Sequence, residues 1–156
     1  GAGCRGQGGL DRTDDRSRPL RVTRVFVDTS AFVALRNRAE REHEAARATL
    51  LGLVEERALL CTSNHVFAET YTALLVRVGR AEAIEWGGRF RAGAAIELLR
   101  VDEPVEEDAW AMLESHTDKQ WSYVDATSFA LMEREGVQSA FAFDHHFTQR
   151  GLTVLP

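Results

Sequence analysis

The sequence has few cysteines, few prolines and no long apolar run. Its 156 residues include two cysteines and three prolines. Cys4 lies in a polar stretch and Cys61 in an apolar one, so the pair offers neither a metal-ligand spacing nor a disulfide framework. No apolar run approaches the roughly 20 residues that span a bilayer, and the first residues lack the apolar core of a secretory signal. These absences predict a cytoplasmic protein in which Cys61 is a small core residue.

Positive charge is also scarce. The formal net charge is −5 and Lys119 is the only lysine, which argues against a protein that coats nucleic acid through bulk electrostatics. A nuclease is not excluded, because a metal site built of carboxylates itself lowers the net charge. The cationic side chains are almost all guanidinium groups, which suit bidentate phosphate contacts. For each arginine a solvated helix face is the stronger interpretation; the candidates for following a nucleic-acid backbone are Arg36, Arg38, Arg77, Arg80, Arg89 and Arg91.

Residues 1–20 contain almost no apolar side chain. Such a segment cannot offset the entropy of ordering its backbone, so we expect residues 1–20 to be a disordered leader that folding and activity do not need. The whole chain is 44% hydrophobic and 28% charged, and residues 21–156 are long enough for one well-buried domain.

Beyond the leader, strand signals alternate with helix signals. Apolar runs predict strands at residues 22–27, 59–62, 96–101, 140–143 and 152–155. Helical spacing, caps and glycine stops predict six helices. The first begins at Ala31 after a Ser30 cap, the second spans residues 42–57, and the third has Ser63 or Asn64 as its cap and ends at Gly79. The other three span residues 81–91, start near Pro104 and span residues 123–135. This alternation predicts an α/β fold with a parallel sheet covered on both faces.

Four acidic residues, far apart in sequence, fall where such a fold would bring them together: Asp28, Glu69, Asp125 and Asp144. Asp28 and Asp144 each follow an apolar run, and ligand crevices of open α/β sheets lie outside the carboxyl ends of the strands. Glu69 lies in a helix with apolar residues on two sides. Carboxylates in one crevice repel one another unless a cation binds, and oxygen ligands select Mg²⁺ or Mn²⁺.

Each acid also has a structural explanation when taken alone. Asp28 or Asp144 could cap the turn after its strand, and Ser122 with Asp125 matches a capping box. For a single aspartate at such a place the capping interpretation is the stronger one. The four acids together are hard to obtain from capping alone, so a shared crevice is the simpler account.

Other constellations are weaker. The sequence has no phosphate-binding glycine loop and no Gly-x-Ser-x-Gly elbow, and its histidines lack the spacing of zinc ligands on one helix. His145 and His146 could ligate a metal or contact a phosphate, although lining a polar loop is the stronger interpretation. His43 is expected to make a structural contact near the first strand. Three tryptophans are expected to be core or interface anchors: Trp86, Trp110 and Trp121.

The acids lie in four short segments: VDTSAF at residues 27–32, NHVFAET at 64–70, WSYVDATSF at 121–129 and AFDHHF at 142–147. In this order and spacing they resemble the PIN-domain proteins of the VapC type, over about residues 22–156. The resemblance implies a PIN-like three-layer α/β/α fold with a central parallel sheet of four to five strands. It also implies a metal-dependent endoribonuclease, commonly the toxin of a type II toxin-antitoxin pair.

The resemblance further implies a site, a cofactor and partners. One or two Mg²⁺ ions, or Mn²⁺, would be held by Asp28, Glu69, Asp125 and Asp144, with Thr29, Ser30 and Asp118 in the surrounding shell. The ions would activate water for in-line attack on RNA, leaving a 5′-phosphate and a 3′-hydroxyl. A cognate antitoxin is the implied partner, and a homodimer is expected because exposed apolar helix stripes usually mark an interface.

Two alternatives remain open at this point. A phosphohydrolase could use Asp28 as a nucleophile, although the usual second aspartate two residues on is replaced by Ser30. A noncatalytic binding module could dock a partner through the apolar faces of residues 71–78 and use the acids for a structural ion. A metal-dependent RNA cleavage assay separates all three.

Overall fold

The sheet has five strands, all parallel, in the order β3-β2-β1-β4-β5. The computed structural model describes residues 22–156, so the prediction of a disordered leader at residues 1–20 lies outside the described residues. The strands are β1 (Arg24–Val27), β2 (Leu59–Ser63), β3 (Ile96–Leu99), β4 (Ser139–Phe141) and β5 (Thr153–Leu155). The predicted α/β class and the count of four to five parallel strands are confirmed.

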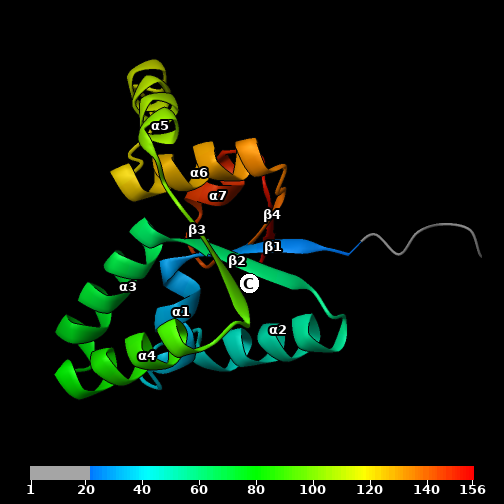
Figure 1. Cartoon of the computed structure of the whole chain (residues 1–156), viewed down its shortest axis with the longest axis vertical. Coiled ribbons are helices and arrows are strands. Elements are labelled where there is room, and N and C mark those ends of the chain that lie inside the picture. Colours follow the sequence, from blue (N-terminus) through cyan, green and yellow to red (C-terminus); the bar gives the residue numbers. More distant parts are fainter. Residues whose placement is uncertain (1–21) are drawn as a thin grey trace, which may run out of the picture.

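Helices cover both faces of this sheet, which makes three layers (Figure 1). One face carries α1 (Thr29–Arg36), α2 (His43–Glu55), α3 (Asn64–Arg77) and α4 (Arg80–Ala92). The other face carries α5 (Glu103–Ser115), α6 (Tyr123–Glu135) and α7 (His146–Gln149). The helices α3 and α4 run side by side and reach away from the sheet as an arm (Figure 1). None of the described helices is long and apolar enough to cross a membrane.

The start of α1 differs from the prediction. Asp28 is the N-cap, because its carboxylate accepts a hydrogen bond from the Ser30 backbone N–H, so the helix begins at Thr29 and not at Ala31. For α3, Ser63 is the cap, since its hydroxyl accepts from the Val66 N–H.

The last strands also differ in part. Strand β4 ends at Phe141, because the Phe143 N–H donates to the Ser30 hydroxyl instead of continuing the ladder. The short helix α7 was not predicted. Helix α6 was predicted to the residue, and Gly136 ends it with a φ of 66°, a left-handed conformation that glycine adopts without strain.

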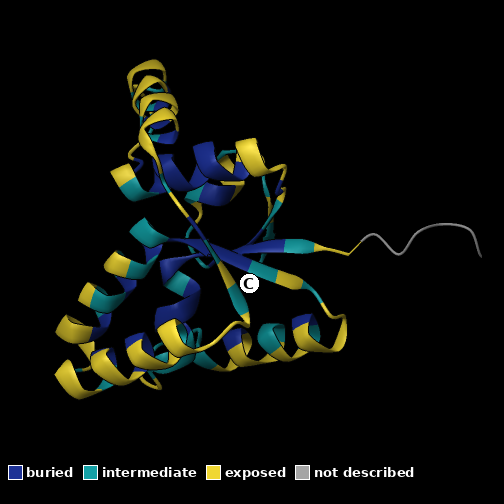
Figure 2. Cartoon of the chain, in the orientation of Figure 1, coloured by how far each residue is buried: buried dark blue, intermediate teal, exposed yellow. Residues whose placement is uncertain are grey.

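The centre of the core is β1, which lies between β2 and β4. Val25 and Phe26 are fully buried, and Cys61 packs beside them on β2, which confirms Cys61 as a core residue. Figure 2 shows β1 and much of α6 as buried. Trp86 and Trp121 are buried as predicted, whereas Trp110 on α5 is 56% exposed. His43 makes the predicted structural contact, a 2.7 Å hydrogen bond to the Ala34 carbonyl of α1.

Candidate active site

The main cleft lies where the strand order of the sheet reverses. The chain passes from β1 to β2 on one side, and β4 returns on the other side of β1. Ligands of open α/β folds bind at this switch point, outside the carboxyl ends of the strands. The cleft has a volume of about 630 Å³, and the four acids predicted from the sequence all line it: Asp28, Glu69, Asp125 and Asp144.

Asp28 is the buried centre of this cleft, with 5% of its surface exposed. Its Oδ2 accepts hydrogen bonds from the Ser30 backbone N–H at 3.0 Å and from the Ser30 hydroxyl at 2.6 Å. The pKa of Asp28 is raised to about 6, mainly by burial and also by the charges of Asp125 and Glu69, against the lowering effect of the two Ser30 hydrogen bonds. Asp28 therefore lies close enough to both other carboxylates to be repelled by them.

Asp125 both caps a helix and lines the cleft. Its Oδ2 accepts from the Ser122 N–H at 2.7 Å, while the Ser122 hydroxyl accepts from the Asp125 N–H at 3.0 Å, a complete capping box at the start of α6. The same Oδ2 lies 3.0 Å from Nδ1 of His146. Asp125 therefore completes the capping box and also lines the cleft, so the cap does not exclude a place in the site.

His146 links the carboxylates of Asp125 and Asp144. Its Nδ1 lies 3.3 Å from Oδ1 of Asp144, in addition to its contact with Asp125. Its backbone N–H donates to Asp144 Oδ1 at 3.0 Å, which fixes the Asp144 side chain at the start of α7. His145 is mostly exposed, and its Nδ1 is 3.6 Å from Asp144 Oδ1. Asp144, His145 and His146 thus present three potential ligand atoms within 4.8 Å of one another.

Glu69 reaches the cleft from the arm. It is half-buried on α3, and within residues 22–156 its carboxylate forms no hydrogen bond or ion pair. The apolar residues on its side of α3 differ in burial: Val66 is buried and Ala73 lines the cleft, whereas Val76 is 78% exposed. The Glu69 carboxylate is therefore available to a ligand.

Two acids of the cleft were missed by the sequence analysis. Glu40 and Glu42, in the connection between α1 and α2, line the cleft together with Arg77 of α3, which the sequence offered only as one of six arginines that could follow a nucleic-acid backbone. Arg77 Nη1 donates to Glu40 Oε1 at 3.3 Å. Loop acids carry no periodic signal, but Arg77 lies eight residues after Glu69, two helical turns along one face. That spacing could have placed Arg77 in the cleft rather than on a solvated helix face.

The structure distinguishes the three residues expected around the acids. Thr29 and Ser30 line the cleft, and the buried Thr29 hydroxyl has no hydrogen-bond partner among the described residues. Asp118 does not line it. Its side chain is 73% exposed and lies 3.0 Å from the Lys119 ammonium, whose hydrogen bond lowers the pKa of Asp118. The expectation for Asp118 is corrected: its partner is a neighbouring lysine at the surface.

The residues present fit a hard divalent cation. The donor set is dominated by carboxylate oxygens, which Mg²⁺ and Mn²⁺ prefer. The raised pKa of Asp28 reflects burial and like charges that a cation would offset. Thr29, next to Asp28 in the chain, also lines the cleft, and its buried hydroxyl has no hydrogen-bond partner among the described residues.

Comparison with known proteins assigns the family. The PIN domain model matches residues 25–151, and the chain belongs to the PIN domain family. It is 37% identical over 127 residues to the 23S rRNA-specific endonuclease VapC20 of two strains of Mycobacterium tuberculosis, CDC 1551 / Oshkosh and H37Rv. The match covers 81% of this chain and 94% of that protein.

Solved structures agree with this assignment. The crystal structure of Mycobacterium tuberculosis VapC20, described as a sarcin-ricin loop cleaving toxin, matches with a TM-score of 0.75 at 36% identity, over 83% of this chain and 96% of that one. FitAcB from Neisseria gonorrhoeae matches with a TM-score of 0.62 at 16% identity, and VapBC-1 from nontypeable Haemophilus influenzae with 0.61 at 12%. Both cover 85% of this chain and 96% of the other. At these identities they support the fold alone.

Proposed function

We propose that this protein is a metal-dependent endoribonuclease of the VapC type. The observation that carries the proposal is the convergence of Asp28, Glu69, Asp125 and Asp144 on one cleft at the switch point of a parallel sheet. Similarity to VapC20 over most of both chains supports the reaction class. The proposed cofactor is Mg²⁺, with Mn²⁺ as the alternative.

The side chains of the cleft have different roles in the proposed reaction. The four acids would hold the ion, which when bound would supply activation of water and stabilisation of the charge on the leaving oxygen. Ser30 keeps Asp28 oriented through two hydrogen bonds to Oδ2. His146 keeps Asp125 and Asp144 at a fixed separation. Arg77 is a cation of the cleft that could meet a phosphate oxygen, and Glu40 holds it in place.

The RNA to test first is the sarcin-ricin loop of 23S rRNA, because the VapC20 relative is described as acting on it. A hairpin RNA with that loop is incubated with the protein in Mg²⁺ or in EDTA, beside a hairpin whose loop sequence is scrambled. The expected result is Mg²⁺-dependent cleavage of the native loop, abolished in Asp144→Asn. Cleavage that persists in EDTA and in Asp144→Asn would overturn the proposal, as would no cleavage of either RNA.

Two partners and a location complete the proposal. The toxin-antitoxin resemblance supports a cognate antitoxin that occupies the nuclease when it must be silent. A homodimer through the arm of α3 and α4 is supported by four exposed apolar side chains near its tip: Leu75, Val76, Val78 and Ile84. The proposed location is the cytoplasm, where the RNA substrate is found.

A further inference from the structure

The cleft that would cleave RNA is itself strongly acidic. Glu40 and Glu42 join the four proposed ligands, and Arg77 is the one arginine that lines the cleft among residues 22–156. RNA carries one negative charge per nucleotide, and affinity for it comes largely from lysines and arginines that meet phosphates. An ion can attract the phosphate at the cleavage position, but the flanking phosphates need cationic groups outside the cleft.

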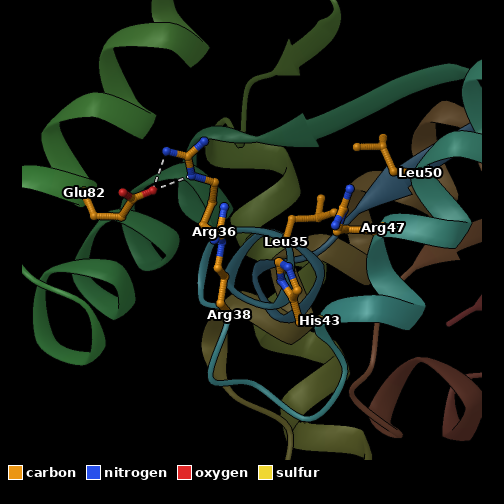
Figure 3. A pocket seen from close by; sticks show the side chains of 7 residues that line it. All are labelled: Leu35, Arg36, Arg38, His43, Arg47, Leu50 and Glu82. Carbon is orange, nitrogen blue, oxygen red and sulfur yellow. Dashed lines mark hydrogen bonds and ion pairs between the residues drawn. The ribbon is translucent and has the colours of Figure 1, made fainter.

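A second cavity supplies such groups. It has a volume of about 540 Å³, and three arginines line it together with His43, Glu82, Leu35 and Leu50 (Figure 3). We call it the arginine pocket, after Arg36, Arg38 and Arg47. Three guanidinium groups and one carboxylate leave it a net charge of +2, in a protein whose net charge is −5.

The three arginines are not equivalent. Arg36, at the end of α1, is paired with Glu82 of α4 (Figure 3) and reaches Glu85 as well. Arg38 is exposed and forms no ion pair within the described part of the chain. Arg47 is 60% exposed, and its one ionic contact there is Glu44 at 3.9 Å. Arg38 and Arg47 therefore have donors to offer an incoming anion.

One face of α2 forms a side of the arginine pocket. His43, Arg47 and Leu50 lie at positions i, i+4 and i+7, so they share one side of α2. The hydrogen bond from His43 to the Ala34 carbonyl fixes that side against α1. Leu35 and Leu50 are the apolar residues that line the pocket beside the arginines.

The pocket and the cleft are adjacent. Ala34 lines the cleft and Leu35 the pocket, and likewise Glu42 lines the cleft and His43 the pocket. Consecutive Cα atoms are about 3.8 Å apart. The two cavities thus lie on opposite sides of one short connection, and a strand that leaves the cleft over this connection enters the pocket.

We propose that the arginine pocket binds a backbone phosphate of the RNA strand that flanks the cleavage position, through the guanidinium groups of Arg38 and Arg47. This inference rests on the proposed function of the cleft. A polyanion that occupies the cleft must continue beyond it, and the adjacent pocket offers the compensating charge. An acidic peptide of a protein partner is the competing occupant, and the experiment distinguishes the two.

The test compares Arg38→Gln/Arg47→Gln with Arg57→Gln. Arg57 is an exposed arginine in the turn before β2 and lies at the opposite end of the sheet from the cleft. Binding of the fluorescently labelled sarcin-ricin hairpin is measured by anisotropy in Mg²⁺ over a range of KCl, with every protein in an Asp125→Asn background to prevent cleavage. Thermal melting checks that each variant is folded.

The double variant should bind RNA about tenfold more weakly at low salt, since it lacks two guanidinium donors for charge-assisted hydrogen bonds. For this variant, the logarithm of the RNA association constant should fall less steeply with log[KCl]. The slope should be shallower by about 0.7 for each phosphate that these arginines neutralise in the native protein. The Arg57→Gln variant should match its parent. In proteins that keep Asp125, the double variant should raise KM and leave kcat within about twofold.

Unchanged RNA affinity and slope in the folded double variant would overturn the proposal. So would unchanged RNA binding combined with weaker binding of a labelled glutamate- and leucine-rich peptide, because the pocket would then be a protein-docking site. Failure of the proposed function would be a separate result. In that case the native protein would not cleave the hairpin, whereas the effect of the two arginines on RNA binding would still be measurable.

Discussion

The hydroxyl of Ser30 donates a 2.6 Å hydrogen bond to Oδ2 of Asp28. The same hydroxyl accepts the Phe143 N–H at 3.0 Å. One small side chain therefore connects the residue that follows β1 to the segment that follows β4, which carries Asp144. The carboxylates of Asp28 and Asp144, which follow β1 and β4, therefore owe their relative position to this contact as well as to the sheet.

Removal of that hydroxyl should be costly. Ser30→Ala leaves the Asp28 carboxylate and the Phe143 N–H each short of one partner, and removing a hydrogen bond to a charged group costs roughly 1.5–3 kcal/mol. Urea denaturation should show that the free energy of unfolding of Ser30→Ala is lower by an amount of that order. Thr29→Val is the matched control, because the Thr29 hydroxyl is buried without a partner among the described residues, so its removal should leave stability equal or slightly higher. Equal stability of Ser30→Ala and the native protein would contradict this account.

Asp125→Asn should separate folding from catalysis. Asparagine keeps an oxygen that can accept the Ser122 N–H, and it caps helices about as well as aspartate, so the metal-free protein should be as stable or more stable once a repelling charge is gone. An ion at about 100 times its dissociation constant stabilises the native state by roughly 2.7 kcal/mol. The variant should lose most of this Mg²⁺ effect and nearly all RNA cleavage, as measured by melting with and without Mg²⁺ and by a hairpin assay.

Ser122→Ala is the complementary variant. It removes the hydroxyl that accepts the Asp125 N–H and keeps the carboxylate. Removal of an N-cap costs about 1 kcal/mol, so the melting temperature should fall while cleavage at lower temperature stays near normal. Full activity and full Mg²⁺ response in Asp125→Asn would instead leave Asp125 with the capping role alone.

The stability of the metal-free protein should depend on pH through Asp28. Its pKa is about 6 in the fold against an ordinary value of 3.8, so between pH 4 and 6 the folded state keeps a proton that the unfolded state releases. The free energy of unfolding should therefore fall as pH rises through this window, by at most about 3 kcal/mol. Urea denaturation in EDTA at several pH values should show this fall in the native protein and its absence in Asp28→Asn.

The proposed homodimer can be tested at Val76. Its side chain is 78% exposed on α3, and Val76→Asp would place a charge among the apolar residues of the arm. Light scattering at micromolar concentration should give a dimer for the native protein and a monomer for this variant. Val54→Asp is the control, since Val54 is also exposed, at 64%, but lies on α2. If the native protein is already a monomer at this concentration, the homodimer proposal is wrong.

The sequence predicted those elements whose signals are local. Helix α6 has a capping box at one end and a left-handed glycine at the other, and both signals are readable in a single stretch of chain. The four acids were found because strand ends and buried helix faces leave a pattern. By contrast, β4 was predicted too long, because what ends it is a side chain 113 residues earlier.

The residues that the sequence analysis missed, or named without assigning a contact, act through tertiary contacts. Glu40 and Glu42 look like ordinary loop acids until the α1–α2 connection folds over the cleft. His146 was weighed as a ligand or a loop residue, but its contact with Asp125 spans 21 positions and requires α6 and α7 to be in place. Such contacts leave no periodicity in the sequence.

The parallel pairing of β1 with β4 also determines when the cleft can exist. Asp28 emerges early in synthesis, but its backbone N–H donates to Phe141 and its neighbour Ser30 binds Phe143. Domains fold as units during synthesis, and pairings this distant in sequence form late. A growing chain, or any truncated product that stops before β4, therefore lacks Asp144 and the strand that anchors Asp28. The cleft is therefore incomplete until β4 and the segment that follows it have been synthesised.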